Sequence, residues 1–340
     1  MKKDLKIKQG MRTFVLAEVA QNHDGSLGLA HAHIDLAHEC GADGVKFQTH
    51  IADFESSADE PWRVKFSSQD STRFDYWKRM EFTPEQWAGL KKHADEKGLV
   101  FLSSPFSGEA VELLEKIGVT GWKVASGEIN NPFVLRPIIK SGLPTIISTG
   151  LSDMVEVEKA VNLFKVRNID CAVLQCTSMY HCPADKIGLG LLSEYRDKFE
   201  TSVGLSDHSG TIFPGLAAAS IGAEVVEVHF TFDKRLFGPD IKASLDPNEL
   251  KLLTAGVRFI YDMKTAPYEK TLSKEVHEMR SVFTKSIVIK EFIKKGEVIT
   301  ISKLTGKKPL KGLPANEIDN VIGSVAACDL QVGHYIQSGD

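Results

Sequence analysis

The regular alternation of short apolar runs with longer segments of helical periodicity, between residues 13 and 265, most constrains how this chain can fold. The runs are rich in Val, Ile, Leu and Phe on both faces, which is typical of parallel strands covered by helices. Eight such runs occur, over residues 13–19, 44–48, 99–104, 121–126, 144–149, 171–176, 202–206 and 224–230. Helical segments such as 27–40, 83–98 and 153–165 separate them.

Eight β–α units in about 250 residues predict an α/β fold of the (β/α)8 TIM-barrel type. An open, doubly wound sheet is the alternative, but no G-x-G-x-x-G motif follows the first run. The barrel domain is predicted over residues 1–265, followed by a charged linker over 266–281 and a small β-rich module over 282–340. A module of this size has little core, so we expect it to dock on a larger body.

Composition excludes several classes of function. The net charge of −4 and the isoelectric point near 6.3 provide no footprint for nucleic acid or an anionic membrane. No apolar run approaches the roughly 18 residues that span a bilayer, and no apolar segment follows the basic N-terminus as in a signal peptide. Five cysteines without a C-x-x-C pair indicate reduced thiols and a cytoplasmic protein.

Polar residues stand where the predicted strands end. In a TIM barrel the carboxyl ends of all strands meet at one rim, which is where such enzymes carry out their chemistry. A lone Ser there is usually a helix cap and a lone His a structural group, but here every strand contributes a polar residue. The contributed residues are Glu18, Lys46, Gln48, Ser104, Lys123, Ser126, Glu128, Ser148, Ser178, Tyr180, Ser206, His208 and His229.

Two lysines within predicted strands indicate an anionic ligand. Lys46 and Lys123 alternate with apolar neighbours, and burying an unpaired ammonium group is very costly. Together with the serine hydroxyls they form a reasonable pocket for a phosphate and a carboxylate. Glu18 and Glu128 are the candidates for general acid and base. Asp240, in FGPDIK, is either a ligand for substrate hydroxyls or an ordinary turn aspartate after Gly-Pro.

His208 and His229 end adjacent predicted strands, so we expect their imidazoles to lie side by side. Two neutral imidazoles without a thiolate leave coordination positions open for water and substrate oxygens. Such a mixed site suits Mn²⁺, Co²⁺ or Mg²⁺ better than structural zinc. By contrast, His31, His33 and His38 share no face of their predicted helix, which predicts solvated surface positions.

The connection over residues 50–82 is too long for a plain strand-to-helix loop. It contains the aromatic residues Trp62, Phe66, Phe74, Tyr76 and Trp77. We interpret them first as a separate hydrophobic cluster or a subunit contact. The alternative is a cover over the site, which long loops at barrel strand ends often form.

The motifs at the strand ends resemble those of the sialic acid synthase family, the phosphoenolpyruvate-condensing nonulosonate synthases. They are AEVAQNHDG, GADGVKFQTH, FLSSPF, WKVASGE, STG, QCTSMY, GLSDHSG, EVHFT and GPDIKASLDP. The C-terminal IKKGEVIT and VIGSVAACDLQVG are similar to the SAF, or antifreeze-like, domain of that family. The resemblance covers residues 11–340 in order.

The resemblance implies a metal-dependent condensation of phosphoenolpyruvate with an N-acetylated hexosamine such as ManNAc, giving a nine-carbon sugar acid. It also implies a domain-swapped homodimer. His208 and His229 match the ligands of a cation, usually Mn²⁺, and Glu18 and Glu128 match acidic residues near the reacting centre. Residues matching phosphoenolpyruvate contacts are Lys46, Ser104, Lys123, Ser126, Ser148 and Ser206, and those matching sugar contacts are Gln48, Tyr180 and Asp240.

The chain departs from the family pattern on the sugar side. Ser178 stands where Asn is common, His181 replaces the usual Pro, and Lys308 is at best the counterpart of an arginine in the SAF module. Legionaminic, pseudaminic and sialic acid 9-phosphate synthesis therefore remain alternatives. Two rivals are another metal-dependent barrel enzyme, which would lack the SAF module, and a non-catalytic carbohydrate-binding relative.

Overall fold

The computed structural model describes residues 4–340, and the chain divides into two compact units that meet between Ala266 and Pro267. This division lies beside the predicted end of the barrel domain at residue 265. The segment predicted as a linker, 266–281, contains most of a helix, α11 (Lys274–Phe283). Each unit is described by itself below.

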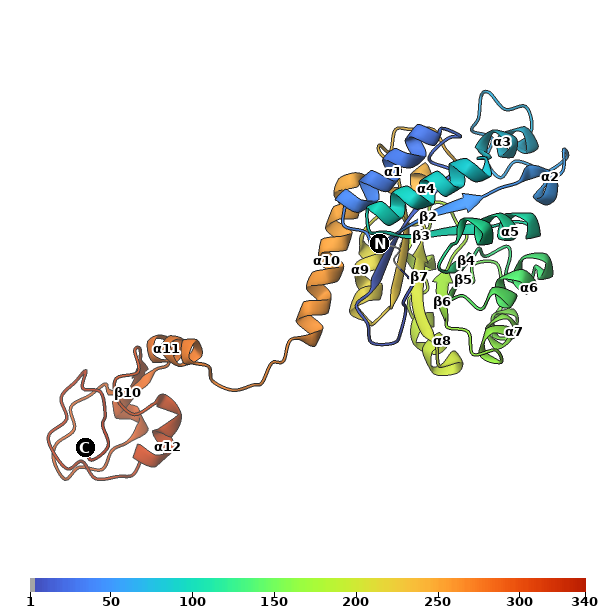
Figure 1. The fold of residues 1–340 in the computed structure, drawn as a ribbon. Coiled ribbons are helices and arrows are strands. Elements are labelled where there is room, and N and C mark those ends of the chain that lie inside the picture. Colours follow the sequence, from blue (N-terminus) through green and yellow to red (C-terminus); the bar gives the residue numbers. More distant parts are fainter. Residues whose placement is uncertain (1–3) are drawn as a thin grey trace. The chain divides into compact units, whose positions relative to one another are not determined.

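The first unit is the predicted barrel. Its eight parallel strands follow the order β3-β2-β1-β8-β7-β6-β5-β4, and Figure 1 labels β2 to β7. A two-residue strand, β9 (Ser244–Leu245), pairs with β8. Strands β3 and β4 lie next to each other without a ladder within residues 4–340, so the barrel is nearly closed. The bounds are β1 Phe14–Ala20, β2 Gly44–Thr49, β3 Val100–Pro105, β4 Trp122–Val124, β5 Thr145–Ser148, β6 Cys171–Cys176, β7 Ser202–Asp207 and β8 Val225–Phe230.

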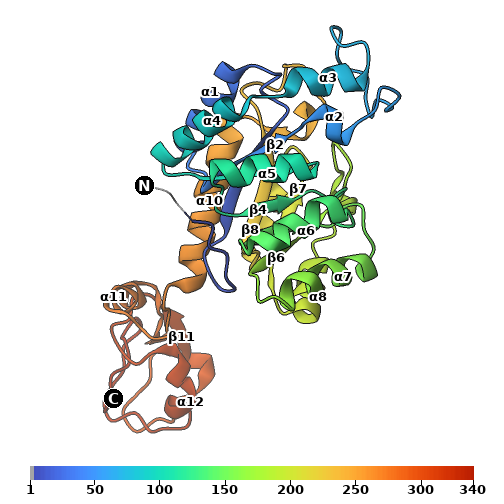
Figure 2. The same ribbon diagram turned by 45° about the vertical axis from the view of Figure 1, so that its right-hand side comes forward.

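Helices cover the outside of the strands, as Figure 2 shows for α5, α6 and α8. Several begin where the sequence provides a cap. Thr83 and Gln86 form a reciprocal capping box at α4, and Asp246 and Glu249 form another at α10. The helices of this unit are α1 Leu27–Glu39, α2 Ala52–Glu55, α3 Arg73–Met80, α4 Pro84–Glu96, α5 Gly108–Ile117, α6 Pro132–Ser141, α7 Met154–Lys165, α8 Leu191–Phe199, α9 Phe213–Ser220 and α10 Pro247–Thr265, with 3-10 turns at Ala184–Lys186 and Ile241–Ala243.

The interior of the barrel changes from apolar to polar along the strands. Near the amino ends, Leu5 joins a buried cluster of inward side chains: Leu16, Val100, Leu102, Ile146, Ala172, Leu174 and Val225. Two positions further along five of these strands stand Glu18, Ser104, Ser148, Cys176 and Glu227, all buried. Because side chains alternate with a period of two, the same inward rows carry the core and then the polar rim.

The prediction for the helix-one histidines is wrong for His33. This residue is fully buried, and its ring packs edge-on against Phe230 and Phe232, 5.3 and 4.5 Å away between ring centres. Its Nδ1–H donates to the carbonyl of Leu29 at 2.8 Å, which satisfies one nitrogen inside the helix. The burial follows from packing of α1 against the end of β8, which helical spacing of histidines does not reveal.

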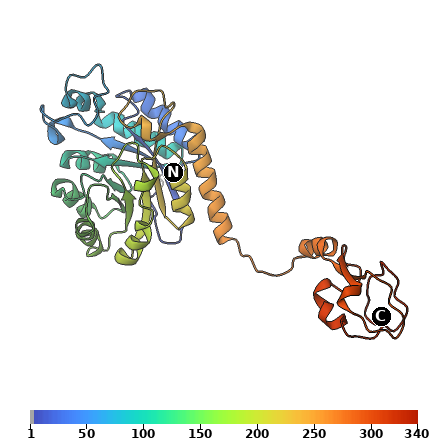
Figure 3. The ribbon, with the colours of Figure 1, turned by 180° about the vertical axis from the view of Figure 1, so that it is seen from behind.

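The second unit is small and has its own core. Strands β10 (Ser286–Ile289) and β11 (Leu304–Lys307) pair antiparallel, and α12 covers Ile318–Val321, with 3-10 turns at Ile301–Lys303 and Ala315–Glu317. The red end of the ribbon in Figure 3 belongs to this unit. In this unit Lys308 follows β11, and its Nζ lies 4.8 Å from the centre of the Phe283 ring. No helix within residues 4–340 is long and apolar enough to cross a membrane.

Candidate active site

Four charged side chains form the floor of a cavity at the carboxyl ends of the strands. Nζ of Lys46 lies 2.7 Å from Oε2 of Glu18 and 4.0 Å from Oε2 of Glu227, and Nζ of Lys123 lies 3.4 Å from Oε1 of Glu227. Strand register creates the first pair, since Glu18 and Lys46 are partners across the β1–β2 ladder. All four side chains are buried, so their charges compensate one another where water is scarce.

The two carboxyl groups of this floor, Glu18 and Glu227, have pKa values that are shifted in opposite directions. Burial raises the pKa of Glu18 to about 7, although Lys46 opposes the shift. Burial acts on Glu227 in the same direction, but Lys123 and Lys46 outweigh it and lower the pKa to about 2. Burial also lowers the pKa of Lys123, partly offset by Glu227. Glu18 is therefore the carboxyl group of the floor that can exchange a proton near neutral pH.

Serine hydroxyls line the same floor. Ser148 accepts from Nζ of Lys123 at 2.7 Å, and Ser104 accepts from Nζ of Lys46 at 3.3 Å. Ser206 donates to Glu227 at 2.8 Å. Ser126 accepts from the backbone N–H of Gly150 at 3.0 Å, and a Cβ at this position would lie 2.5 Å from Oγ of Ser178, so that a neighbouring side chain would have to shift. Two ammonium groups among these hydroxyls can receive an anionic ligand.

The two predicted metal-site histidines lie side by side, with ring centres 5.2 Å apart. Nδ1–H of His208 donates to the carbonyl of Thr177 at 2.8 Å, so the lone pair of this ring lies on Nε2. Burial lowers the pKa of His229 well below its usual value, which keeps the ring neutral, and its buried Nδ1 has no partner among residues 4–340. Burial alone would lower the pKa of His208, but Cys176 outweighs it and raises the pKa to about 8, so a bound cation would take the place of a proton on this ring. The side-by-side positions of the two rings suit a shared cation.

The described residues would provide only part of the coordination sphere of a cation. Within residues 4–340 no group of three or more His, Cys, Asp or Glu side chains is placed to hold a metal ion. Two imidazoles alone leave the remaining positions to water and substrate oxygens, which fits Mn²⁺ or Mg²⁺ chemistry. Tyr180 stacks on His208 at 4.2 Å between ring centres and stands edge-on to His229 at 5.8 Å.

An arginine from the 50–82 connection lies next to Tyr180, on the side of the cavity that holds His208 and His229. Nη2 of Arg63 lies 2.7 Å from Oδ1 of Asp240, and its guanidinium lies 4.0 Å above the Tyr180 ring. Asp240 is buried at 5% exposure and is thus held by an ion pair, which goes beyond the turn role that spacing alone allowed. Sequence reasoning missed Arg63, because no local pattern indicates where a long loop returns.

Another wall of the cavity is formed by His50 and the two aromatic rings that stack on it. His50 stacks between Trp77 and Phe106, with ring centres 4.1 and 4.5 Å away. Its Nδ1 lies 2.5 Å from Oε1 of Glu55, and its Nε2–H donates to Oε1 of Gln48 at 3.2 Å. The amide of Gln48 in turn donates to Oε1 of Glu18 at 3.1 Å. A chain of hydrogen bonds thus joins the connection to the floor.

Most predicted site residues meet in this one cavity of about 470 Å³. Ser104 lies just behind Lys46 instead of lining it, and Lys308 belongs to the second unit. Sequence reasoning missed Glu227, although its position two residues before His229 on an inward row could have revealed it. The predicted residues that line the cavity are Glu18, Lys46, Gln48, Lys123, Ser126, Glu128, Ser148, Ser178, Tyr180, Ser206, His208, His229 and Asp240.

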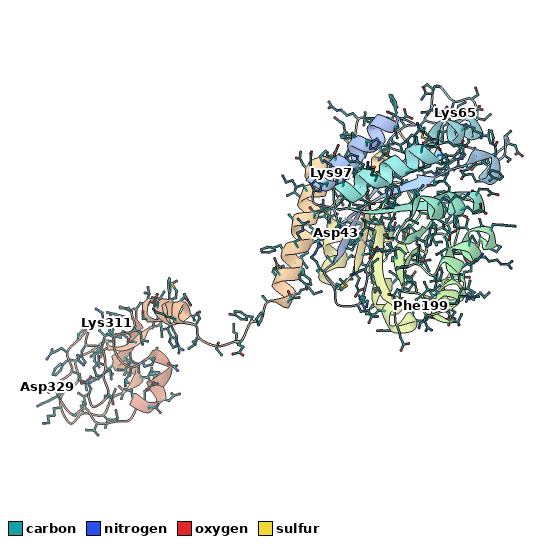
Figure 4. The ribbon with its side chains drawn as sticks, viewed as in Figure 1. Asp43, Lys65, Lys97, Phe199, Lys311 and Asp329 are labelled. Carbon is teal, nitrogen blue, oxygen red and sulfur yellow. The ribbon has the colours of Figure 1, made fainter. Side chains whose placement is uncertain are left out.

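The 50–82 connection has two of the three roles considered for it, those of a hydrophobic cluster and of a cover over the site, while the subunit contact stays a prediction. Trp62, Phe66 and Tyr76 pack on one another, with ring centres 5.1 to 5.9 Å apart, as a hydrophobic cluster would. The same three rings line the cavity, so the connection also covers the site. In Figure 4, Lys65 marks this connection, while Asp43 marks the opposite end of β2 and pairs with Arg12 away from the cavity.

The families that match this chain divide it into two parts, close to the division between its two compact units. Residues 33–268 match the model of the NeuB family, and residues 284–340 match that of the SAF domain. The chain is 36% identical to N,N'-diacetyllegionaminic acid synthase of Campylobacter jejuni, over 93% of this chain and 96% of the relative. It is 35% identical to human N-acetylneuraminate-9-phosphate synthase, over 91% and 87%.

Solved structures agree with these sequence relatives. The N-acetylneuraminic acid synthetase of Leptospira borgpetersenii, crystallised with citrate, superposes with a TM-score of 0.71 at 29% identity. The alignment covers 82% of this chain and 94% of that one. The similarity therefore extends through the barrel that carries the cavity.

Proposed function

This chain belongs to the NeuB family and ends in a SAF domain, and we propose that it condenses phosphoenolpyruvate with an N-acetylated hexosamine. The product is a nine-carbon 2-keto-3-deoxy sugar acid, and phosphate is released. The observation that carries the proposal is the meeting of Lys46 and Lys123 with the His208–His229 pair in one cavity. An anion site beside a cation site is what this reaction needs.

Phosphoenolpyruvate is assigned to the floor. Its phosphate and carboxylate would accept charge-assisted hydrogen bonds from Lys46 and Lys123. Further hydrogen bonds would come from the hydroxyls of Ser126, Ser148 and Ser206. The two lysines are already positioned by Glu18 and Glu227, so little reorganisation accompanies binding. Ser104 supports the site from behind by its hydrogen bond to Lys46.

The proposed condensation consumes one water and releases one phosphate. The C2=C3 double bond of phosphoenolpyruvate opens as C3 bonds to the aldehyde carbon of the open-chain sugar, and water adds its oxygen to C2. The bond from C2 to the phosphate oxygen then breaks, which leaves a keto group at C2. Of the two protons of the water, one ends on the former aldehyde oxygen and the other on the departing phosphate. Glu18 can hold or release a proton because its pKa is about 7 through burial. Glu128, whose pKa burial also raises, is the second acid–base candidate.

His208 and His229 would hold the divalent cation, for which Mn²⁺ is the first choice and Mg²⁺ or Co²⁺ the alternatives. When bound, the cation would polarise the aldehyde as a Lewis acid. The protein's own contribution is to orient the His208 ring through its bond to Thr177 and to keep the His229 ring neutral through burial. Tyr180, Gln48, Ser178 and Asp240 are assigned to the sugar.

We further propose a cytoplasmic, domain-swapped homodimer in which the SAF unit of one chain, with Lys308, caps the barrel of the other. All five cysteines are free thiols, which fits a reducing compartment. The SAF unit has only a small core of its own, which supports docking on a larger body. Light scattering should give twice the chain mass of 37.5 kDa, whereas a monomer would contradict this part of the proposal.

The test is phosphate release by chelator-treated protein given phosphoenolpyruvate, Mn²⁺ and a panel of sugars. The panel contains ManNAc, its 6-phosphate and a 2,4-diacetamido-trideoxy hexose, because relatives with 32–36% identity are named for different products. We expect phosphate release that requires both an acceptor and the cation. Binding of phosphoenolpyruvate without any turnover would instead favour a non-catalytic carbohydrate-binding protein.

A further inference from the structure

The outer end of the cavity is built largely by the 50–82 connection and is aromatic. Trp62, Phe66, Tyr76 and Trp77 all line it, and Tyr76 links the cluster to Trp77 with ring centres 5.1 Å apart. Phe106 continues this wall on the other side of His50. Aromatic faces pack well against the C–H groups of a sugar and against acyl methyl groups, but they provide no counter-charge.

Carboxylates accompany this aromatic wall. Glu55, Glu60 and Glu128 line the same cavity. Glu128 accepts a hydrogen bond from the amide of Asn131 at 2.6 Å and has no cation partner among residues 4–340. Burial raises the pKa of Glu128 and the charge of Glu55 acts in the same direction, while the bond from Asn131 and the charge of His50 oppose the shift. Glu55 itself lies 2.5 Å from Nδ1 of His50.

The cations of the connection that line the cavity are already paired. Arg73 lies 3.1 Å from Oε1 of Glu60, and Arg63 lies 2.7 Å from Oδ1 of Asp240. Each guanidinium also lies over a ring, Arg73 over Trp77 at 5.2 Å and Arg63 over Tyr180 at 4.0 Å. Releasing either arginine for a new anion would therefore break an ion pair and a cation–π contact together.

We propose that this end of the cavity selects an uncharged N-acylated sugar and rejects the same sugar carrying a 6-phosphate. The inference rests on the proposed function, which places the aldehyde carbon at the histidines and so directs C6 outward to the connection. A phosphate dianion there would meet Glu55, Glu60 and Glu128, and every Lys and Arg of residues 4–266 that lines the cavity is already in an ion pair. Juxtaposed like charges are a strong means of excluding a wrong ligand.

The experiment compares kcat/KM for ManNAc and ManNAc 6-phosphate in the full chain with Mn²⁺. In the unmodified protein we expect a preference for the uncharged sugar of at least about tenfold. The informative variant is Glu60→Gln, which keeps an oxygen that can accept from Nε1–H of Trp77 while it releases Arg73 from its ion pair. This change should reduce the preference about tenfold, mainly by raising kcat/KM for the phosphorylated sugar.

Glu81→Gln is the matched control. Glu81 lies in the same connection with nearly equal side-chain exposure, 27% against 28% for Glu60, and pairs with Lys78, but it does not line the cavity. Its substitution should leave the preference unchanged. Equal or better turnover of the 6-phosphate by the unmodified protein would overturn the inference while leaving the synthase function standing. No phosphate release with either sugar would overturn this inference, and the synthase function would fall with it only if the 2,4-diacetamido sugar also released no phosphate.

Discussion

Lys46 on β2 reaches across the ladder to its register partner Glu18 on β1, with 2.7 Å between Nζ and Oε2, inside a cavity floor that excludes most water. The pair links the anion site to the carboxyl group best suited to exchange a proton. Anion binding by Lys46 and proton exchange by Glu18 therefore depend on the same local charges, because a change in either residue alters the charge on the other.

The first prediction concerns Glu18. Glu18→Gln keeps the shape and removes the exchangeable proton, so kcat should fall by about 10²–10⁴-fold. Binding of phosphoenolpyruvate, measured by calorimetry, should weaken little, because Lys46 loses a competing partner and gains freedom to bind the ligand. Single-turnover and steady-state phosphate release would measure the effect on chemistry. An unchanged kcat would remove Glu18 from the mechanism.

The second prediction concerns the cation. His208→Ala and His229→Ala should each abolish Mn²⁺ binding in a calorimetric titration and reduce turnover to the chelator-treated level. His181→Ala is the matched control, because this imidazole follows Tyr180 but is exposed and does not line the cavity. Full Mn²⁺ binding by both site variants would show that the cation is held elsewhere.

The third prediction concerns Arg63. Arg63→Ala should raise KM for the sugar about tenfold and leave KM for phosphoenolpyruvate nearly unchanged, because Arg63 positions Tyr180 and Asp240 but touches nothing in the floor. Arg63→Lys should recover only part of the loss, since an ammonium group cannot stack on the ring in the same way.

Lys65→Ala tests whether any cation in this loop has the same effect. Lys65 is exposed two residues further along the connection and does not line the cavity (Figure 4). Its removal should change neither KM. A parallel loss of affinity for both substrates in Arg63→Ala would indicate general disruption of the cavity instead of a role toward the sugar.

The fourth prediction concerns acid stability. Burial lowers the pKa of His33 to about 4 in the folded chain, below its ordinary value of 6.5. The stabilisation linked to the neutral ring is therefore fully present above pH 6.5 and is lost as the pH falls toward 4. Between pH 7.5 and 5 this one group should lower the free energy of unfolding by about 2 kcal/mol.

His33→Gln isolates that contribution, because the amide does not titrate. Urea unfolding at the two pH values should show a smaller decrease for this variant than for the unmodified chain. His38→Gln, on the exposed side of the same helix, should retain the full decrease. An identical pH dependence in all three proteins would contradict the assignment of acid sensitivity to His33.

Much of the site was predictable because its rule is local. Strands with a period of two carry their inward rows from core to rim, and a parallel barrel brings all carboxyl ends together, so residues such as Lys123 and His229 could be assigned without coordinates. Glu227 obeys the same rule and could have been included. His33 shows the limit, because its burial depends on Phe230, which is distant in the sequence.

The sequence by itself determined the order of strands and helices, the location of the rim, and the chemical groups that each strand brings to it, since these follow from periodicity and chain direction. Only the tertiary structure decided which of those groups pair. It brought Lys46 on β2 within 2.7 Å of Glu18 on β1, and it placed Arg63 of the 50–82 connection beside Asp240. The physical reason is the distance along the chain between the interacting residues. Hydrogen bonding within a helix or turn depends on neighbouring residues, whereas ion pairs and burial depend on segments that the fold brings together from far apart in the chain.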